Sequence, residues 1–345
     1  MEIRKITQAI CDWFSQNKET YFFRENRDPY LVFVSELALQ QTRLANAYPI
    51  LKKFLQHYPD VKSLASAHEQ DILSLWAGLG YYRRGRQLRE AAHMLLEKYN
   101  GQFPSRYEDL LLIPGIGPYT AAMIASLCFS EKILALDGNI KRVLSRLLGI
   151  RHEISSRAFL LEVRKVETEI FNYPISPGVI NEAFMEFGQK ICTVNPQCNI
   201  CFLSSLCQAY LSAETHHLPK RKKARLREKI FWYALLVLKD NFVLVQKNDT
   251  LSLLRHLYIL PSFVVYQEQK KEEYSFPKNL LAFSKKPQLP YIRHSIMHYN
   301  IYASFYYSHT LTTNLPKEFI WISKDNLSYY LTSSLMRKLV HEARL

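Results

Sequence analysis

Apolar and polar positions follow two different patterns along the chain, and the change comes near residue 210. Up to about Tyr210, apolar residues recur three and four positions apart, which is the spacing of one face of an α-helix. The spacing is clearest in five stretches: 28–55, 68–82, 83–101, 119–128 and 140–149. Short connections separate them, so this half of the chain is predicted to be an all-α domain, with Pro29 starting its first long helical stretch.

After Lys229 the pattern becomes alternating, with many aromatic and β-branched residues. Residues 230–238, 240–247 and 302–310 show the alternation best, and each is predicted to be a strand. We therefore expect a helical domain over 1–211 and a smaller α+β domain over 229–345. The segment between them, 212–228, is strongly basic, and it is either a solvated tether or a strap that contacts phosphates.

Composition favours two ordered domains and a polyanionic partner. The chain has 345 residues, of which 48% are hydrophobic, and a formal charge of +14 with a pI near 9.4. Such a field attracts nucleic acid or an anionic membrane, and it also serves solubility. The N-terminus lacks the apolar core of a signal peptide, and no apolar run reaches the roughly 20 residues of a membrane helix. A soluble intracellular protein is expected.

Four of the six cysteines lie close together near the end of the helical half: Cys192, Cys198, Cys201 and Cys207. In a reducing compartment such a cluster favours metal over disulfides. Four thiolates can surround either an iron–sulfur cluster or a tetrahedral zinc ion.

Two further motifs carry possible chemistry, and each also has an ordinary structural interpretation. Ser105 and Glu108 form a capping-box pattern for a short helix, which ends at Gly115 and Gly117 before another helix. Backbone N–H groups at such a turn can bind a phosphate, although a plain tight turn is equally typical of the pattern. Asp137 stands where it can be either a helix N-cap or a reactive carboxylate.

A second carboxylate, Glu36, interrupts an apolar helical stretch, FVSELALQQT. A lone Glu in that position is usually a partly exposed or paired residue. Beside Asp137 it is also the second of two acids that a reaction could use.

The ordered motifs together resemble the A/G-specific adenine DNA glycosylases of the helix–hairpin–helix superfamily. The motifs are DPYLVFVSELALQQT, WAGLGYYRRGRQL, IPGIGPYTA, LDGNIKRV, INEAFMEFG and the four cysteines. The likeness is close from about Trp13 to Tyr210 and looser in the C-terminal domain. It implies a DNA-clamping hairpin at Gly115 and Gly117, one 4Fe-4S cluster on the four cysteines, and a nudix-like C-terminal fold.

The resemblance also implies roles for individual residues. Glu36 would be the general acid at adenine N7, and Asp137 would stabilise or transiently add to the oxocarbenium carbon, with Asn139 holding it. The remaining implied positions surround the adenine or the duplex, as base contacts or wedges: Arg24, Glu182, Gln41 and Tyr82. Without the motifs around them, these four residues would be ordinary surface or core side chains.

Tyr119 indicates which chemistry is absent. Bifunctional relatives carry a Lys at this hairpin position, and that amine forms a Schiff base with the sugar. A phenol cannot form an imine, so we expect a monofunctional glycosylase. Tyr119 is expected to hydrogen-bond the catalytic carboxylate, although a purely packing role is compatible with the sequence.

The chain departs from the family pattern in two places. Cys192 and Cys198 have five residues between them, where the family usually has six. The loop expected to read 8-oxoguanine usually contains Phe-Ser-His or Phe-Thr-His, and this chain has Ile296-Met297-His298. A thioether donates no hydrogen bond, so weaker discrimination of 8-oxoguanine is expected. There is also no acidic nudix box, so nucleotide hydrolysis by this domain is not expected.

The sequence thus predicts an enzyme that removes adenine from A:8-oxoguanine or A:G pairs in double-stranded DNA. A related glycosylase of different base specificity and a non-catalytic DNA-binding homologue are the alternatives. We expect a monomer with no membrane association, in the bacterial cytoplasm at the nucleoid.

Overall fold

The computed structural model of the chain separates into two compact units. It describes residues 1–345 except 1–2, 223–225, 278–279, 284–286, 289 and 311–313, so part of the predicted basic linker lies outside the described residues. Unit 1 contains residues 1–44, 55–66 and 87–223, and unit 2 contains 45–54, 67–86 and 224–345. Each unit is described separately below.

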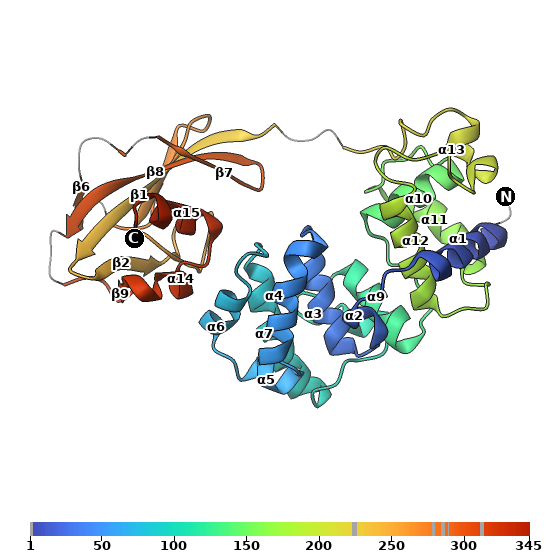
Figure 1. The fold of residues 1–345 in the computed structure, drawn as a ribbon, viewed down its shortest axis with the longest axis horizontal. Coiled ribbons are helices and arrows are strands. Elements are labelled where there is room, and N and C mark those ends of the chain that lie inside the picture. Colours follow the sequence, from blue (N-terminus) through green and yellow to red (C-terminus); the bar gives the residue numbers. More distant parts are fainter. Residues whose placement is uncertain (1–2, 223–225, 278–279, 284–286, 289, 311–313) are drawn as a thin grey trace. The chain divides into compact units, whose positions relative to one another are not determined.

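The helices of the first 211 residues follow one another with short connections (Figure 1). They are α1 (Ile3–Asn17), α2 (Phe22–Glu25), α3 (Pro29–Leu39), α4 (Leu44–His57), α5 (Val61–Ala65), α6 (Glu69–Leu75), α7 (Arg83–Tyr99), α8 (Tyr107–Leu110), α9 (Pro118–Phe129), α10 (Gly138–Leu148), α11 (Arg157–Ile170), α12 (Pro177–Lys190), η1 (Ser204–Leu206) and α13 (Gln208–Leu211). Proline opens α3, α9 and α12 within their first two positions, where its missing N–H costs nothing. The all-α prediction for this region is confirmed in its fold class.

The helical stretch predicted to run from Pro29 through residue 55 is broken in the structure. α3 ends at Leu39, and α4 begins at Leu44. Gln41 between them has φ 57°, in the left-handed region that ends helices. Apolar spacing continues across the break because both helices bury a face, so periodicity alone does not locate it.

The helix start predicted from Ser105 also differs. Residue Arg106 occupies the cap position of α8 and makes no side-chain cap. The N–H of Tyr107 instead donates to the carboxylate of Glu131 at 2.9 Å. A residue distant in sequence thus satisfies the helix terminus.

The main core of unit 1 lies between α1, α10, α11 and α12. Fully buried side chains from these helices form it: Ile10, Ile140, Phe159, Ile180 and Phe187. Two glycines of α12 allow close helix contact. A Cβ on Gly178 would stand 2.6 Å from the Leu127 backbone on α9, and one on Gly188 would stand 2.9 Å from Cβ of Asn139 at the start of α10.

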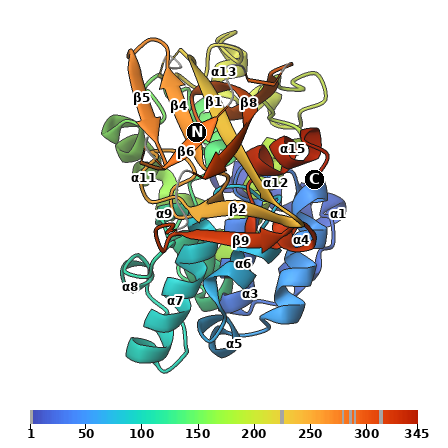
Figure 2. The ribbon, with the colours of Figure 1, turned by 90° about the vertical axis from the view of Figure 1, so that its left-hand side faces the viewer.

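Unit 2 contains a sheet and two C-terminal helices together with parts of the α4–α7 region. The strands are β1 (Glu228–Lys239), β2 (Phe242–Lys247), β3 (Tyr258–Ile259), β4 (Ser262–Tyr266), β5 (Lys271–Tyr274), β6 (Leu281–Phe283), β7 (Ile292–Ile296), β8 (Tyr299–Thr310) and β9 (Phe319–Ser323). β1 is central, because it pairs antiparallel with β4 and β2 and parallel with β8. Figure 2 shows β5, β4, β1 and β8 side by side, with β2 and β9 paired below them.

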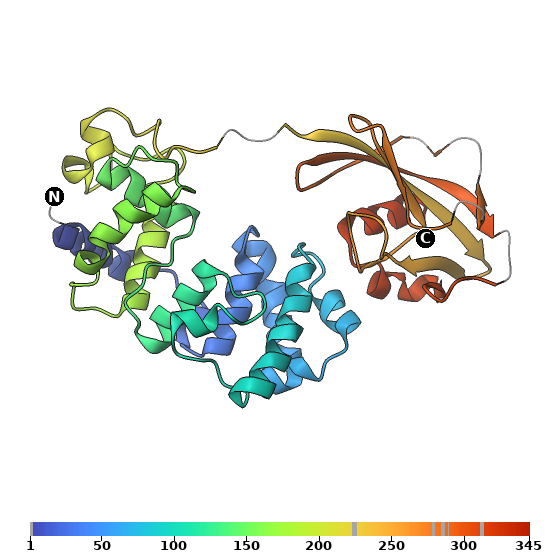
Figure 3. The same ribbon diagram turned by 180° about the vertical axis from the view of Figure 1, so that it is seen from behind.

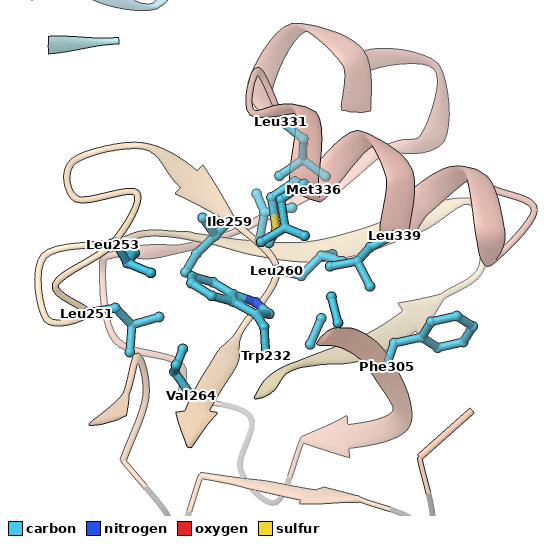
Figure 4. Close-up of a cluster of buried hydrophobic side chains, with 14 of the residues drawn as sticks. Trp232, Leu251, Leu253, Ile259, Leu260, Val264, Phe305, Leu331, Met336 and Leu339 are labelled. Atoms are coloured by element: carbon cyan, nitrogen blue, oxygen red, sulfur yellow. The ribbon is translucent and has the colours of Figure 1, made fainter. Parts of the chain in front are cut away.

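One face of this sheet is covered by α14 (Leu327–Tyr330) and α15 (Ser334–Glu342), which follow the short η2 (Lys324–Asn326). Figure 4 shows Trp232 of β1 among Ile259, Leu260 and the helix-side residues Leu331, Met336 and Leu339. Trp232 and Met336 are both fully buried. The alternating pattern predicted for 230–238 is therefore present as a strand with one face in this core.

β7 and β8 form a hairpin whose two-residue tip is Met297 and His298. Ile296 and Tyr299 are the last paired residues below the tip. Met297 has φ 54° and is 70% exposed. An exposed apolar side chain at a left-handed backbone position is uncommon, so the tip differs from an ordinary hairpin turn. The hairpin can be followed from both sides in Figures 1 and 3.

Candidate active site

The predicted catalytic and adenine-contacting residues of the helical region meet at one pocket in unit 1. Its volume is about 640 Å³. Its lining comes from the α2 and α3 region, α9, α10 and α12, and it includes seven predicted residues: Arg24, Glu36, Gln41, Tyr119, Asp137, Asn139 and Glu182. A cleft of this size with few convergent polar groups is typical of a small-ligand or base site.

Glu36 projects from the third turn of α3, an otherwise apolar helix. The pKa of its carboxyl is raised from 4.5 to about 7, mainly by burial and in smaller part by the charges of Asp137 and Glu182, while a hydrogen bond from Tyr119 and the charge of Arg24 oppose the rise. A carboxyl with this pKa is partly protonated at neutral pH, so it can donate a proton.

Asp137 is the N-cap of α10, as one of its two interpretations predicts, and it also lines the pocket. Its Oδ1 accepts from the N–H groups of Asn139 at 2.9 Å and Ile140 at 2.7 Å. Its Oδ2 accepts from the Asn139 side-chain amide at 2.6 Å. Burial raises its pKa, and these three donors and the Arg142 charge limit the increase. The donors hold the carboxylate in one orientation.

Tyr119 lies at the second position of α9, beside both acids. Its hydroxyl oxygen lies 3.4 Å from the Met185 sulfur, and the phenol hydrogen-bonds the Glu36 carboxyl. Burial and the neighbouring Glu36 and Asp137 raise its pKa well above the usual range. It is therefore a neutral phenol, suited to donating a hydrogen bond and unsuited to acting as a nucleophile.

Two carboxylates of α12 are paired with arginines: Glu182 lines the pocket, and Glu186, one turn farther along, holds the pocket-lining Arg24. Glu186 Oε2 accepts from Arg24 at 2.6 Å, and Lys190 lies 2.9 Å from its other oxygen. Glu182 Oε2 accepts from Arg27 at 2.9 Å. The side chains of Glu182 and Glu186 are only 5% and 2% exposed. These pairs fix the arginines against the pocket wall.

Arg142 links the N-terminal end of α10, which lines the pocket, to the loop of the first clustered cysteine. It is buried, and one nitrogen donates to Asn139 Oδ1 at 2.9 Å and to the Gly188 carbonyl at 2.6 Å. Its Nε donates to the Cys192 carbonyl at 2.8 Å. Arg142 therefore positions Asn139, and through it Asp137.

The Gly-x-Gly turn joins α8 to α9. Gly115 has φ +81°, and a Cβ there would stand 3.0 Å from Gln87, so both conformation and space favour glycine. Gly117 is the N-cap of α9 and provides no side-chain hydrogen bond to the first turn. The first-turn N–H groups of α9 thus have no side-chain cap, as an anion-binding helix start requires.

The four clustered cysteines line one small cavity beside Arg146 and Phe187. Arg146 donates to the Cys192 sulfur at 3.4 Å and to the Val194 carbonyl at 3.0 Å. Burial raises the pKa of Cys201 to about 11. Within the part of the chain that the structure describes, no three His, Cys, Asp or Glu residues are grouped closely enough to hold a metal ion. The four thiols line one cavity beside an arginine, and thiols are suitable metal ligands, but in their described positions they do not form a metal-binding group.

Two predicted residues do not line the pocket. Tyr82 belongs to unit 2, where its hydroxyl donates to the Thr332 carbonyl at 2.7 Å. His298 lies at the β7–β8 tip, with its ring centroid 4.0 Å from that of Tyr299.

Sequence reasoning missed the residues that support the pocket. Arg27, Glu186 and Arg142 were not predicted, yet they hold Glu182, Arg24 and Asn139. The spacing gave a partial signal: Glu182 and Glu186 are four apart on one face of α12, whereas Arg27 lies beyond the end of α2 and shares no helical face with Arg24.

Among the described residues, no helix has the length and apolar character needed to cross a membrane.

Residues 34–166 match the HhH-GPD family model, described as a superfamily of base excision DNA repair proteins. An adenine DNA glycosylase of Buchnera aphidicola from Acyrthosiphon pisum is 32% identical, over 85% of this chain and 85% of its own. The human adenine DNA glycosylase is 36% identical over 63% of this chain and 41% of its own.

Among solved structures, a thermostable thymine-DNA glycosylase superposes with a TM-score of 0.54 at 24% identity, over 61% of this chain and 97% of its own. An endonuclease III–DNA complex gives 0.51 at 23% identity, over 61% and 96%. These two likenesses support the helix–hairpin–helix glycosylase fold of the helical region. On the identity to the Buchnera relative across most of both chains, the protein belongs to the adenine DNA glycosylases of the HhH-GPD superfamily.

Proposed function

We propose that this protein is a monofunctional DNA glycosylase that removes adenine mispaired with 8-oxoguanine or guanine. One observation carries the proposal: Glu36 and Asp137 line the same pocket, and burial raises the pKa of both. Cleavage of an N-glycosidic bond needs a proton for the leaving base and an anion beside the sugar. A buried pair of carboxyls can provide both.

The adenine would leave the duplex and enter the pocket before reaction. Glu36, with a pKa near 7, donates its proton to N7 of the base. Bond cleavage then leaves positive charge on the sugar, which the Asp137 carboxylate stabilises. Asn139 keeps that carboxylate in place. Glu36, now ionised, accepts a proton from the attacking water.

The opposite wall would recognise the base. Glu182 is held by Arg27, and Arg24 is held by Glu186, so one acid and one guanidinium have fixed orientations at the pocket. Adenine presents both donors and acceptors on its edges, which match this mixed wall.

Tyr119 supports a hydrolytic outcome. A Schiff base requires an amine, and a phenol stands at the hairpin position where bifunctional relatives carry Lys. No lysine lines the pocket among the described residues. The expected product is an abasic site in an intact strand.

The C-terminal domain would be nudix-like and would read the base opposite the adenine through the β7–β8 tip. His298 is a possible donor there, and the exposed Met297 provides a polarizable apolar contact. The four cysteines would hold a 4Fe-4S cluster. When bound, the cluster would fix the loop from Cys192 to Cys207 and thereby the end of α12.

The test is single-turnover cleavage of two duplexes, adenine opposite 8-oxoguanine and adenine opposite guanine. Each reaction is analysed with and without alkali, and Glu36→Gln is compared with Glu162→Gln, a surface control. We expect strand breaks only after alkali, a faster reaction opposite 8-oxoguanine, and loss of both with Glu36→Gln. Iron and sulfide analysis with an absorbance spectrum tests the cluster separately.

Each contrary result removes a defined part of the proposal. Breaks without alkali would contradict the monofunctional assignment. Equal rates on the two duplexes would remove lesion reading by the β7–β8 tip. No adenine release from either duplex would overturn the enzymatic function, and zinc in place of iron would overturn only the cluster.

A further inference from the structure

The sheet of unit 2 has a second face, and one end of it carries aromatic side chains where a solvent face normally carries polar ones. Along β1, Ile230 and Trp232 are fully buried, whereas Phe231 and Tyr233 point to the other face and are half-buried. An antiparallel sheet with one solvated face usually alternates apolar with polar residues. Here both faces of β1 are apolar or aromatic.

Neighbouring strands extend this aromatic face. Phe231 is paired with Tyr302 of β8, which is paired with Arg293 of β7. The rings of Phe231 and Tyr302 are 5.8 Å apart, and those of Phe231 and Tyr291 are 5.7 Å apart. We call Phe231, Tyr233, Tyr291 and Tyr302 the aromatic platform.

The far part of the same face is closed by other side chains. Phe263, Phe276 and Leu281 pack there with Leu235 and Tyr306 into a second buried cluster. The C-terminal helices cover the opposite face of the sheet. The platform is thus the end of this face that is left half-exposed.

Cations surround the platform. Lys229 Nζ lies 5.0 Å from the Phe231 ring centroid and 4.7 Å from that of Tyr302. The Arg293 guanidinium carbon lies 6.0 Å from the Tyr302 centroid. Among the described residues neither cation forms an ion pair, whereas Lys271 on β5 pairs with Glu273 at 2.7 Å. One acid, Glu272, lies on this face, but on the outer strand β5, where it accepts from Tyr274.

We infer that the aromatic platform is a binding site for single-stranded DNA, separate from the glycosylase pocket. Unstacked bases present flat π faces for which half-exposed rings are suitable partners, and the phosphates beside them match Lys229 and Arg293. Positive charge beside stacking aromatics is the combination that single-strand binding surfaces use. The inference does not depend on the glycosylase reaction.

Photocrosslinking on the full chain tests the site directly. The probe is a thymidine oligonucleotide with single 5-iodouracil substitutions, and crosslinked peptides are mapped by mass spectrometry. Crosslinks at Phe231, Tyr291 or Tyr302 are expected. Crosslinks confined to unit 1 would overturn the inference without any variant having to fold.

Binding measurements provide the matched comparison. Phe231→Leu and Tyr302→Leu should each weaken oligonucleotide binding about tenfold in fluorescence anisotropy. The control is Tyr307→Leu, because Tyr307 is also on β8 and 50% exposed but points to the other face. Equal affinities for all three variants would contradict the site.

The charge contribution is tested by salt dependence. The double change Lys229→Gln with Arg293→Gln should reduce the slope of log affinity against log salt by about 1.4, since each phosphate contact to a single strand contributes roughly 0.7. Lys239→Gln, an exposed position at the other end of β1, is the control. Adenine release from the duplex substrates should be unchanged in all these variants, so a failed glycosylase assignment and a failed platform would be distinguished. Self-association of the chain that Phe231→Leu abolishes would assign the platform to a second copy and overturn the inference.

Discussion

The buried carboxyls on the two sides of the pocket differ in whether they form ion pairs. On the α3 and α10 side, Glu36 and Asp137 face each other's charge, and burial raises both pKa values. On the α12 side, Glu182 and Glu186 are more deeply buried, but each is paired with an arginine at 2.9 or 2.6 Å. Burial is therefore the main influence on the carboxyls of Glu36 and Asp137, whereas Glu182 and Glu186 orient the arginines with which they pair.

Removing the proton donor should produce the largest effect. Glu36→Gln preserves the shape of the side chain but cannot transfer a proton, so we expect adenine release to fall about a thousandfold. Single-turnover kinetics on the 8-oxoguanine duplex measures the loss. A rate within tenfold of the wild type would show that the two walls do not differ in chemistry.

Breaking a pair on the α12 wall should affect folding more than chemistry. Glu186→Gln leaves Arg24 and Lys190 without their shared anion, and we expect the free energy of unfolding to fall by about 3 kcal/mol. The control is Glu162→Gln, whose exposed pair with Lys165 should contribute less than about 1 kcal/mol. Urea denaturation of the wild type, Glu186→Gln and Glu162→Gln measures these losses. Equal denaturation midpoints would show that the ion pairs of Glu186 do not stabilise the fold.

The pH profile sharpens the comparison. Because Glu36 must be protonated to act as an acid and its pKa is raised to about 7, the rate should be highest below pH 7 and should fall about tenfold per unit above it. The same raised pKa means that the protonated acid favours folding at low pH, a contribution lost as pH rises from 4.5 to about 7. A rate that is independent of pH across this window would exclude Glu36 as the titrating acid.

The smallest predicted change tests the hydrogen bond from Tyr119. That bond favours the charged form of Glu36, so Tyr119→Phe should raise the pKa and move the falling limb of the profile upward by about one unit. The amplitude of the rate below the limb should change little. A downward movement of the limb would contradict the direction of this interaction.

The sequence predicted the layout of the molecule better than the supports of its pocket. Helical spacing and alternation gave the two fold classes, because these patterns follow from local geometry. The sequence did not predict the break between α3 and α4 at Gln41, because both flanking helices bury apolar faces. The sequence also did not predict how the start of α8 is satisfied, because the Glu131 carboxylate that accepts from Tyr107 comes from another part of the chain. Contacts between distant segments have no periodic signature.

The pocket residues came from the ordered motifs, and seven of them line one cavity. The same motifs did not identify Arg27, Glu186 or Arg142, whose importance lies in what they hold. Nor did they indicate the aromatic platform, because alternation of aromatic residues in 230–238 is typical of any half-buried strand. The placement of Lys229 and Arg293 beside the half-buried rings distinguishes that face from an ordinary half-buried strand face.

The two glycines of α12 have a consequence for inherited variation in this chain. Gly178 lies against the backbone of α9, which carries Tyr119, and Gly188 lies against Asn139. A change of either glycine to alanine would leave every acid, amide and phenol of the pocket in the sequence, yet it would force α12 away from α9 or from the start of α10. Inspection of the pocket-lining positions alone would score such an allele as harmless, although the full-length protein would carry a pocket whose helices no longer pack in the same way.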